Sequence, residues 1–184
     1  MYGGYHGYGG YGYMADPAHL MRLFASVDMN RSGRINALEL QLALHNGTCR
    51  PFNPETVRMM IAMFDRNHDF RIDFYEFHQL WQQIMMWQQS FAVYDINRSG
   101  AINFSELRNA LWSSGYRVSN QLCHYLMMKM DRRKMGRLLF DDYIALCVTL
   151  QMLTAAFRAQ DVNKTGIVSM TFEQFLTAAL LPRV

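Results

Sequence analysis

Helix-length segments rich in apolar residues alternate along the chain with five short polar stretches that follow one pattern. Each stretch begins with Asp, and most continue with polar residues at the third and fifth places, Gly at the sixth and an aliphatic residue at the eighth. The stretches begin at Asp28, Asp65, Asp95, Asp131 and Asp161, so their starts lie 37, 30, 36 and 30 residues apart. A repeat of this length indicates an array of one supersecondary unit.

The apolar segments between these stretches predict the helices. If each polar stretch takes twelve residues, 25, 18, 24 and 18 residues remain between them. The short intervals, residues 77–94 and 143–160, contain no Gly or Pro, so each predicts one uninterrupted helix about 30 Å long. The long intervals contain linkers at residues 46–54 and 113–117, and each predicts two helices. The expected fold class is all-α, with about eight helices.

The start of the chain differs in composition from the rest. Residues 1–13 contain only Tyr, Gly, Met and His. Such a segment has no periodic apolar face and glycine is costly to order, so residues 1–15 are expected to be a disordered tail. An N-cap and a proline at the first helical position, Asp16 and Pro17, then predict the first helix. Residues 16–184 are expected to form the folded domain.

The polar stretches have the composition of calcium-binding EF-hand loops. Calcium takes six to eight oxygen ligands, which a twelve-residue loop supplies from positions 1, 3, 5, 7, 9 and 12, with Gly at position 6. The first and third loops, residues 28–39 and 95–106, meet every one of these demands. Their predicted ligands are Asp28, Asn30, Ser32, the Arg34 carbonyl, Asn36 and Glu39, and Asp95, Asn97, Ser99, the Ala101 carbonyl, Asn103 and Glu106.

The second loop, residues 65–76, is ambiguous. It has the most acidic residues, but Phe70 stands where Gly is expected, and a left-handed backbone there costs roughly 1–2 kcal/mol. We therefore expect weaker calcium binding than the number of acids suggests. Its candidate ligands are Asp65, Asn67, Asp69, the Arg71 carbonyl, Asp73 and Glu76.

The last two loops lack essential ligands. In residues 131–142, Arg133 and Met135 occupy positions 3 and 5, and a guanidinium cannot be a metal ligand. In residues 161–172, Phe172 stands at position 12, and Glu173 comes one residue late. We expect no calcium in the fourth loop and very weak binding or none in the fifth.

The eighth loop position predicts how the hands pair. It is aliphatic in all five loops, and EF-hands pair there through a short two-residue β contact. Hands one and two pair, as do three and four, which leaves Val168 without a partner. A second chain's fifth hand would complete the pairing in a two-fold dimer. The alternative is that the fifth hand folds back onto its own chain. The expected dimer-interface residues are Val168, Phe172, Phe175 and Leu176.

Composition narrows the function further. The formal charge of +3 without a Lys/Arg block gives no indication of nucleic-acid binding. Three cysteines without a CxxC pair favour a reducing compartment, the cytoplasm. The chain contains no run of 18 apolar residues, so a membrane-spanning helix is not expected. Cys123 and His124 are neighbours on a predicted helix and diverge, so they form no nucleophile–base pair. We expect a binding protein and no enzyme.

The chain resembles the penta-EF-hand family. The shared features are five hands, two helices that each join two hands, a fourth loop without a full set of calcium ligands and a Gly-rich tail. Residues 44–54 and 114–119 are most similar to its group containing peflin and the apoptosis-linked-gene-2 protein. The resemblance implies calcium in hands one and three, a homodimer or heterodimer through hand five, and calcium-dependent binding of Pro-rich segments. In the resembled protein aromatic residues line the peptide pocket at the places that match Cys49 and Ser114, so this chain departs from the pattern there. It implies a sensor and adaptor at endomembranes, in vesicle trafficking and cell-death signalling. A calcium buffer, or a regulatory subunit of a calpain-like protease, are the alternatives.

Overall fold

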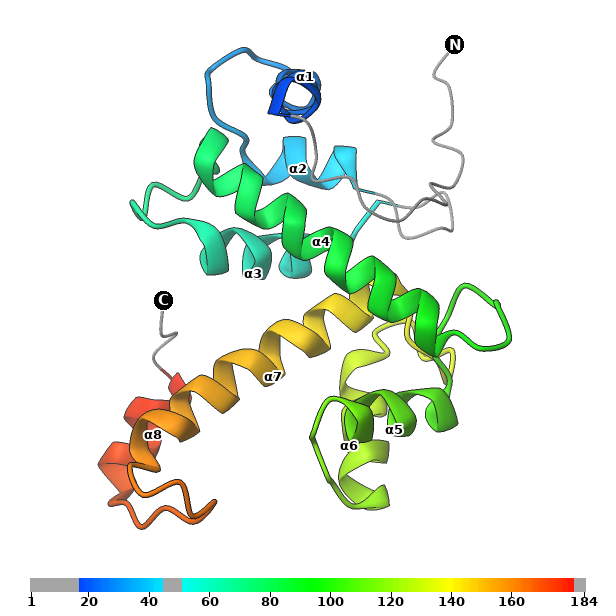
Figure 1. Cartoon of the computed structure of the whole chain (residues 1–184), viewed down its shortest axis with the longest axis vertical. Helices are drawn as coiled ribbons and strands as arrows, with labels where there is room; N and C mark the ends of the chain where they lie inside the picture. The colour runs from blue at the N-terminus through cyan, green and yellow to red at the C-terminus, as the bar shows by residue number, and fades with distance from the viewer. Residues whose placement is uncertain (1–16, 45–50, 181–184) are drawn as a thin grey trace.

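Eight α-helices make up the part of the chain that the structure, a computed structural model, describes (Figure 1). The described residues are 17–44 and 51–180, so the expected tail at 1–15 lies outside them. The all-α prediction is confirmed. The helices are α1 (Pro17–Val27), α2 (Ala37–Ala43), α3 (Pro54–Phe64), α4 (Phe74–Tyr94), α5 (Phe104–Ser113), α6 (Asn120–Met130), α7 (Phe140–Gln160) and α8 (Phe172–Leu180).

The two helices predicted to be shared between hands are present. Both α4 and α7 run for 21 residues without a break. Each begins three residues before the predicted interval, because the helix already starts at position 10 of the preceding loop. Helix α4 therefore joins loops two and three, and α7 joins loops four and five.

The predicted contacts between paired loops are also confirmed. Ile35 and Ile72 form an isolated antiparallel bridge, with N···O distances of 2.8 and 2.9 Å. Ile102 and Leu138 form the equivalent bridge with the same distances. These four side chains are fully buried, so the β contacts also hold the loops to the core.

Helix α7 connects two buried clusters. One cluster is built by hands one and two and includes Ile144 and Val148 of α7. The other is built by hands three and four and includes Tyr143 and Leu146 of the same helix. By length and composition α7 is the single helix of residues 17–44 and 51–180 that is apolar enough to cross a membrane, a test that the core helix of a soluble protein also passes. Its residues in both clusters favour the core-helix interpretation.

Candidate calcium sites

Loop one draws its predicted ligands together around Asp28. The Asp28 carboxylate accepts hydrogen bonds from the backbone N–H groups of Ser32 and Gly33, at 3.0 and 2.7 Å. The Ser32 hydroxyl donates to the Arg34 carbonyl at 2.8 Å and lies 3.3 Å from Asp28 Oδ1. Three of the predicted ligand groups therefore converge at one point.

Glu39 closes the loop at its other end. One of its carboxylate oxygens accepts from the Asn30 N–H at 3.2 Å, and the other from the Asn36 N–H at 2.9 Å. The Asn36 side chain in turn accepts from the Glu39 N–H, which completes a capping box at the start of α2. Both carboxylate oxygens are thus held toward the loop, the arrangement that bidentate coordination requires.

Loop three repeats this arrangement. Asp95 accepts from the N–H groups of Ser99 and Gly100, both at 2.8 Å, and the Ser99 hydroxyl donates to the Ala101 carbonyl at 2.9 Å. Glu106 forms the capping box at the start of α5. The side chains of all four acids in loops one and three are buried, and in the described part of the chain none pairs with a Lys or Arg. Buried carboxylates without a protein cation suit a divalent ion.

The five loops also share a backbone feature that sequence reasoning missed. The fourth position is left-handed in every loop, with φ between 52° and 58°, although none of these residues is glycine. Its N–H returns to the carbonyl of the first Asp in loops one, three, four and five. The residues are Arg31, His68, Arg98, Lys134 and Lys164.

Loop two has the same backbone conformation as its neighbours, but one of its acidic side chains is engaged in a contact that the other loops lack. Phe70 is left-handed, with φ of 60°, as predicted, and its N–H reaches Asp65 Oδ2 at 2.8 Å. Asp69 forms an ion pair with Arg34 of loop one, and Asp73 caps α4. No group of three or more His, Cys, Asp and Glu side chains gathers at a common point within the described ranges. This holds for all five loops, so what sets loop two apart is the ion pair of Asp69 with Arg34.

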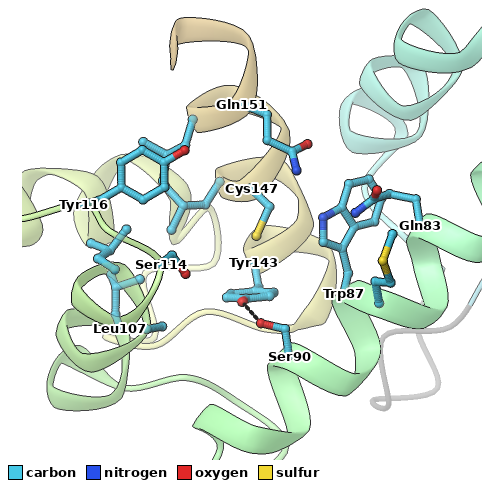
Figure 2. Close-up of a pocket in the computed structure, with 14 residues that line it drawn as sticks. Gln83, Trp87, Ser90, Leu107, Ser114, Tyr116, Tyr143, Cys147 and Gln151 are labelled. Carbon is cyan, nitrogen blue, oxygen red and sulfur yellow. Dashed lines mark hydrogen bonds between the residues drawn. The ribbon is translucent and has the colours of Figure 1, made fainter. Parts of the chain in front are cut away.

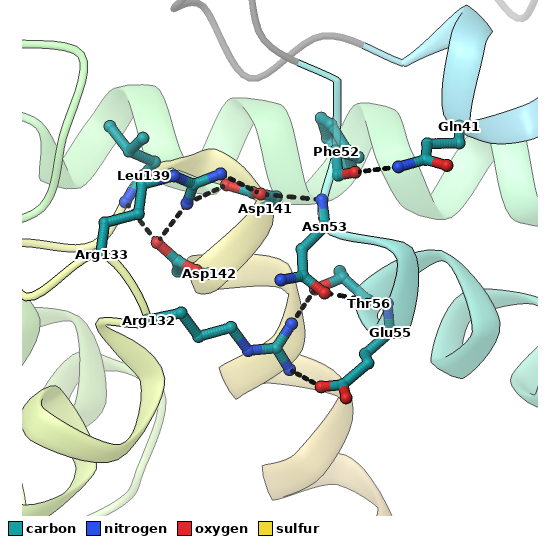
Figure 3. Close-up of polar contacts among 10 residues, drawn as sticks. All are labelled: Gln41, Phe52, Asn53, Glu55, Thr56, Arg132, Arg133, Leu139, Asp141 and Asp142. Carbon is teal, nitrogen blue, oxygen red and sulfur yellow. Dashed lines mark hydrogen bonds and ion pairs between the residues drawn. The ribbon is translucent and has the colours of Figure 1, made fainter.

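Loop four already contains a cation of its own (Figure 3). The Arg133 guanidinium contacts Asp141 at 2.8 Å and Asp142 at 2.9 Å, and both carboxylates are almost completely buried. Burial, with Asp141 close by, raises the pKa of Asp142 from 3.8 to about 6, although Arg133 opposes the shift. The Asp141 carboxylate also accepts from the Asn53 N–H at 3.0 Å, which joins loop four to the start of α3. The arginine thus supplies a positive charge to Asp141 and Asp142, whereas Asp131 Oδ1 and Asp142 Oδ1 are buried without a hydrogen-bond partner within the described residues.

Loop five begins like the calcium loops, but the helix that follows it starts two residues later than in the other loops. Asp161 accepts from the N–H groups of Thr165 and Gly166 at 2.9 and 2.8 Å, as in loops one and three. Thr171 and Gln174 then form a reciprocal pair of hydrogen bonds, so α8 begins at position 12 of the loop instead of position 10. The shift leaves Phe172 where a carboxylate is needed. The Thr-x-x-Gln spacing was a capping signal that could have predicted this start.

A pocket of about 340 Å³ lies beside loop three, between α4, α5 and α7 (Figure 2). Its walls are mostly apolar and include Leu107 and Tyr143, and Ser114, one of the two pocket positions implied by the family resemblance, lines it; Cys49 lies outside the described residues. The Trp87 indole N–H has no hydrogen-bond partner within the described ranges, and Figure 2 shows it turned toward the centre of the pocket. Burial raises the pKa of the Cys147 thiol to about 12, so this thiol stays protonated.

Cys123 and His124 point to different places, as predicted. Cys123 is fully buried, and burial raises the pKa of its thiol. The His124 ring is stacked on Phe104, with 3.8 Å between ring centroids. The pair therefore lacks the geometry of a nucleophile and its base.

Comparison with known proteins decides the family. A family model described as an EF-hand domain pair matches residues 17–82, and one described as an EF hand matches residues 88–112. Grancalcin from Mus musculus is 38% identical over 183 residues, which cover 97% of this chain and 82% of grancalcin. Sorcin from Schistosoma japonicum is 43% identical over 164 residues, which cover 89% of this chain and 95% of sorcin. The chain belongs to the penta-EF-hand family.

Other members of the penta-EF-hand family support the same placement. Peflin from Danio rerio is 40% identical over 158 residues, which cover 85% of this chain and 58% of peflin, so the chain spans little more than half of that relative. A solved homolog of programmed cell death 6 protein from Leishmania major Friedlin superposes with a TM-score of 0.77 at 37% identity, covering 87% of this chain and 91% of the other. The expected similarity to the peflin group is confirmed, and the metal of this penta-EF-hand protein is calcium.

Proposed function

We propose that this penta-EF-hand protein is a calcium sensor and adaptor that binds Pro-rich segments of target proteins when calcium fills loops one and three. One observation carries the proposal: the pocket shares its walls with the third hand. Trp87 belongs to α4, which ends at the first predicted ligand, Asp95, and Leu107 directly follows the last ligand, Glu106. Calcium, by joining these two carboxylates, changes the angle between α4 and α5 and therefore the width of the pocket.

The chemistry of the pocket suits a Pro-rich ligand. Such segments adopt the polyproline II conformation, in which the carbonyl groups are exposed as acceptors, and they dock in grooves lined with aromatic rings. The pocket supplies the rings of Trp87, Tyr116 and Tyr143. The Trp87 N–H, which is buried and unpaired within the described residues, becomes available as a further donor when the pocket widens. Ser114, small and polar, leaves space where the resembled group has an aromatic ring.

The test is calorimetric titration of the full chain with a Pro-rich peptide, in calcium and in a chelator. We expect binding in calcium only. Trp87→Phe keeps a ring but removes the donor, and should weaken binding by roughly tenfold. Trp112→Phe is the matched control, because Trp112 is exposed and lies outside the pocket lining. If the protein binds calcium but no peptide, the result favours the alternative function, a calcium buffer.

Dimerisation through the fifth hand is the second part of the proposal. Val168 forms no bridge within the described residues, whereas the eighth positions of the other four loops are paired. Phe172, Phe175 and Leu176 are exposed, and α8 packs against α7 alone among the helices of Figure 1. A homodimer or a heterodimer with a related chain would bury this surface. In a cell we place the protein in the cytoplasm, with calcium-dependent association with endomembranes.

A further inference from the structure

We propose that the outer face of α6, together with loop four, binds anionic lipid surfaces, and that this binding needs no calcium. The proposed function includes a calcium-dependent association with membranes; this inference goes beyond it and assigns a separate, calcium-independent contact to a defined surface. We refer to this surface as the α6 face. It consists of Leu122, Tyr125, Met128, Lys129, Lys134, Met135 and Arg137.

The apolar part of the α6 face is exposed in the part of the chain that the structure describes. Met128 is 77% exposed and Tyr125 58%, although Met is usually buried. Leu122, Tyr125 and Met128 follow one another at intervals of three residues, which places them on one side of the helix. The opposite side holds Cys123, Met127 and Met130 in the core. The helix therefore has two apolar sides, and one of them faces solvent.

The charged residues of the α6 face are all basic. Residues 107–142 contain seven Lys and Arg against three Asp, a net +4, whereas the whole chain carries +3. The three acids, Asp131, Asp141 and Asp142, are all buried. Lys129, Lys134 and Arg137 of the α6 face are exposed, and none of them forms an ion pair within the described residues. The neighbouring Arg132 of loop four is paired with the exposed Glu55 of α3 at 3.2 Å.

The combination fits a lipid surface better than a peptide or a nucleic acid. Amphipathic rings and long apolar side chains beside Lys are the residues that lie at the level of lipid headgroups. The Lys129 ammonium lies 5.8 Å from the centre of the Tyr125 ring, so aromatic ring and charge occupy one spot. Anionic headgroups attract clustered basic residues near the membrane surface.

Calcium is not required for this contact, because the hand that presents the α6 face does not use it. Arg133 already forms ion pairs with Asp141 and Asp142 in loop four. The loop is therefore held in shape by the protein alone. Calcium in loops one and three would then enable binding of a Pro-rich peptide by a protein that already binds the membrane surface through the α6 face.

The test is co-sedimentation of the full chain with vesicles of phosphatidylcholine, with and without phosphatidylserine, in a chelator and in calcium. We expect binding to the anionic vesicles in both conditions, reduced by salt, and none to neutral vesicles. K129E/K134E should lower the partition coefficient about tenfold or more. R22E/R158E makes the same charge change on exposed residues of α1 and α7 and should leave most of the binding.

Two further variants separate this surface from the peptide pocket. M128S keeps every charge and should weaken binding to anionic vesicles, because it removes the exposed apolar side chain. K129E/K134E should bind the Pro-rich peptide as the wild type does, since neither lysine lines the pocket. The inference is overturned if the wild type stays in solution with anionic vesicles in chelator, if R22E/R158E loses as much binding as K129E/K134E, or if the face captures an acidic peptide but no vesicle.

Discussion

At the residue scale, the glutamate at the twelfth loop position serves the helix and the metal at once. Glu39 and Glu106 each complete a capping box with the Asn at position 9 and hold both carboxylate oxygens toward the loop. The loop is therefore closed by hydrogen bonds from the protein, and calcium would replace those bonds with coordination. Helix capping and metal binding can be separated, because Gln caps as well as Glu but carries no charge.

Glu39→Gln and Glu106→Gln should each remove one calcium ion from the complex, because the bidentate carboxylate is lost. Helix capping survives, so the calcium-free thermal midpoint should change little. Calorimetric titration measures the stoichiometry. Glu55→Gln is the control, since Glu55 lies in the first turn of α3 outside any loop. An unchanged stoichiometry in either loop variant would move the site elsewhere.

Phe70 has a backbone conformation that glycine would adopt with less strain. Phe70→Gly should tighten calcium binding by loop two, and relief of about 1–2 kcal/mol corresponds to roughly 5- to 30-fold. Phe70→Ala is the control, because alanine removes the ring but keeps the strain of a Cβ atom. A titration in which the alanine variant gains as much as the glycine variant would show that the exposed ring, and not the backbone, limits the site.

The sequence predicted the conformation of Phe70, but it did not predict where Asp69 would go. The left-handed backbone at position 6 follows from the loop template alone. The ion pair joins Arg34 and Asp69, which lie 35 positions apart in the sequence, and their loops become neighbours only through the bridge between Ile35 and Ile72. Such a contact depends on the register of paired loops, which a single loop sequence does not specify.

At the element scale, loop four is a calcium loop that has been rebuilt around an arginine. The absence of calcium ligands at positions 3 and 5 was readable from the sequence. The replacement cation was not, because Arg133 could equally have pointed into solvent. In the structure Arg133 points inward, because its ion pairs with two buried carboxylates offset the cost of removing the guanidinium from water. The first residues of α4 and α7 were not predicted correctly from the sequence. The apolar intervals placed the starts of these helices three residues too late, because loop residues cap them and the helix begins inside the loop.

Asp142 should make the stability of loop four depend on pH. Its pKa is raised in the folded protein to about 6, above the ordinary 3.8, so the folded chain binds more protons between these values. The unfolding free energy should therefore fall as the pH rises from about 4 to about 6. Asp142→Asn stays neutral and should lack this part of the slope. The measurement is the thermal midpoint of both proteins in chelator across this range.

The two proteins differ at one side chain only, so the difference between wild type and Asp142→Asn isolates that group. The variant should gain stability relative to the wild type as the pH rises, because the wild type then carries a buried charge next to Asp141. Parallel midpoint curves for the two proteins would mean that Asp142 has an ordinary pKa.

At the scale of the whole molecule, α7 divides the chain into a packed part and an unpartnered one. The first half of α7 contributes Ile144 and Val148 to one core cluster and Leu146 to the other. Its second half carries the fifth hand, which reaches away from the four paired hands in Figure 1. That half still contacts the paired hands through Met152 and through the hydrogen bond of 3.1 Å between Thr154 and Tyr116. The sequence predicted this division from the odd number of hands. It did not predict that one helix would contact both clusters, because its apolar residues point in several directions.

Removing the residues that follow Gln160 should convert the proposed dimer to a monomer without unfolding the rest. The core clusters keep every residue of α7 that they use, whereas Val162, Ile167 and Phe172, all exposed, leave with the fifth hand. Light scattering coupled to size exclusion measures the mass, and circular dichroism reports the helices that remain. In the full chain, Phe172→Ser should weaken association. Phe70→Ser, on an equally exposed ring of loop two, should not. A truncated chain that keeps the mass of a dimer would place the interface on the four paired hands, where the exposed α6 face would be the first surface to examine.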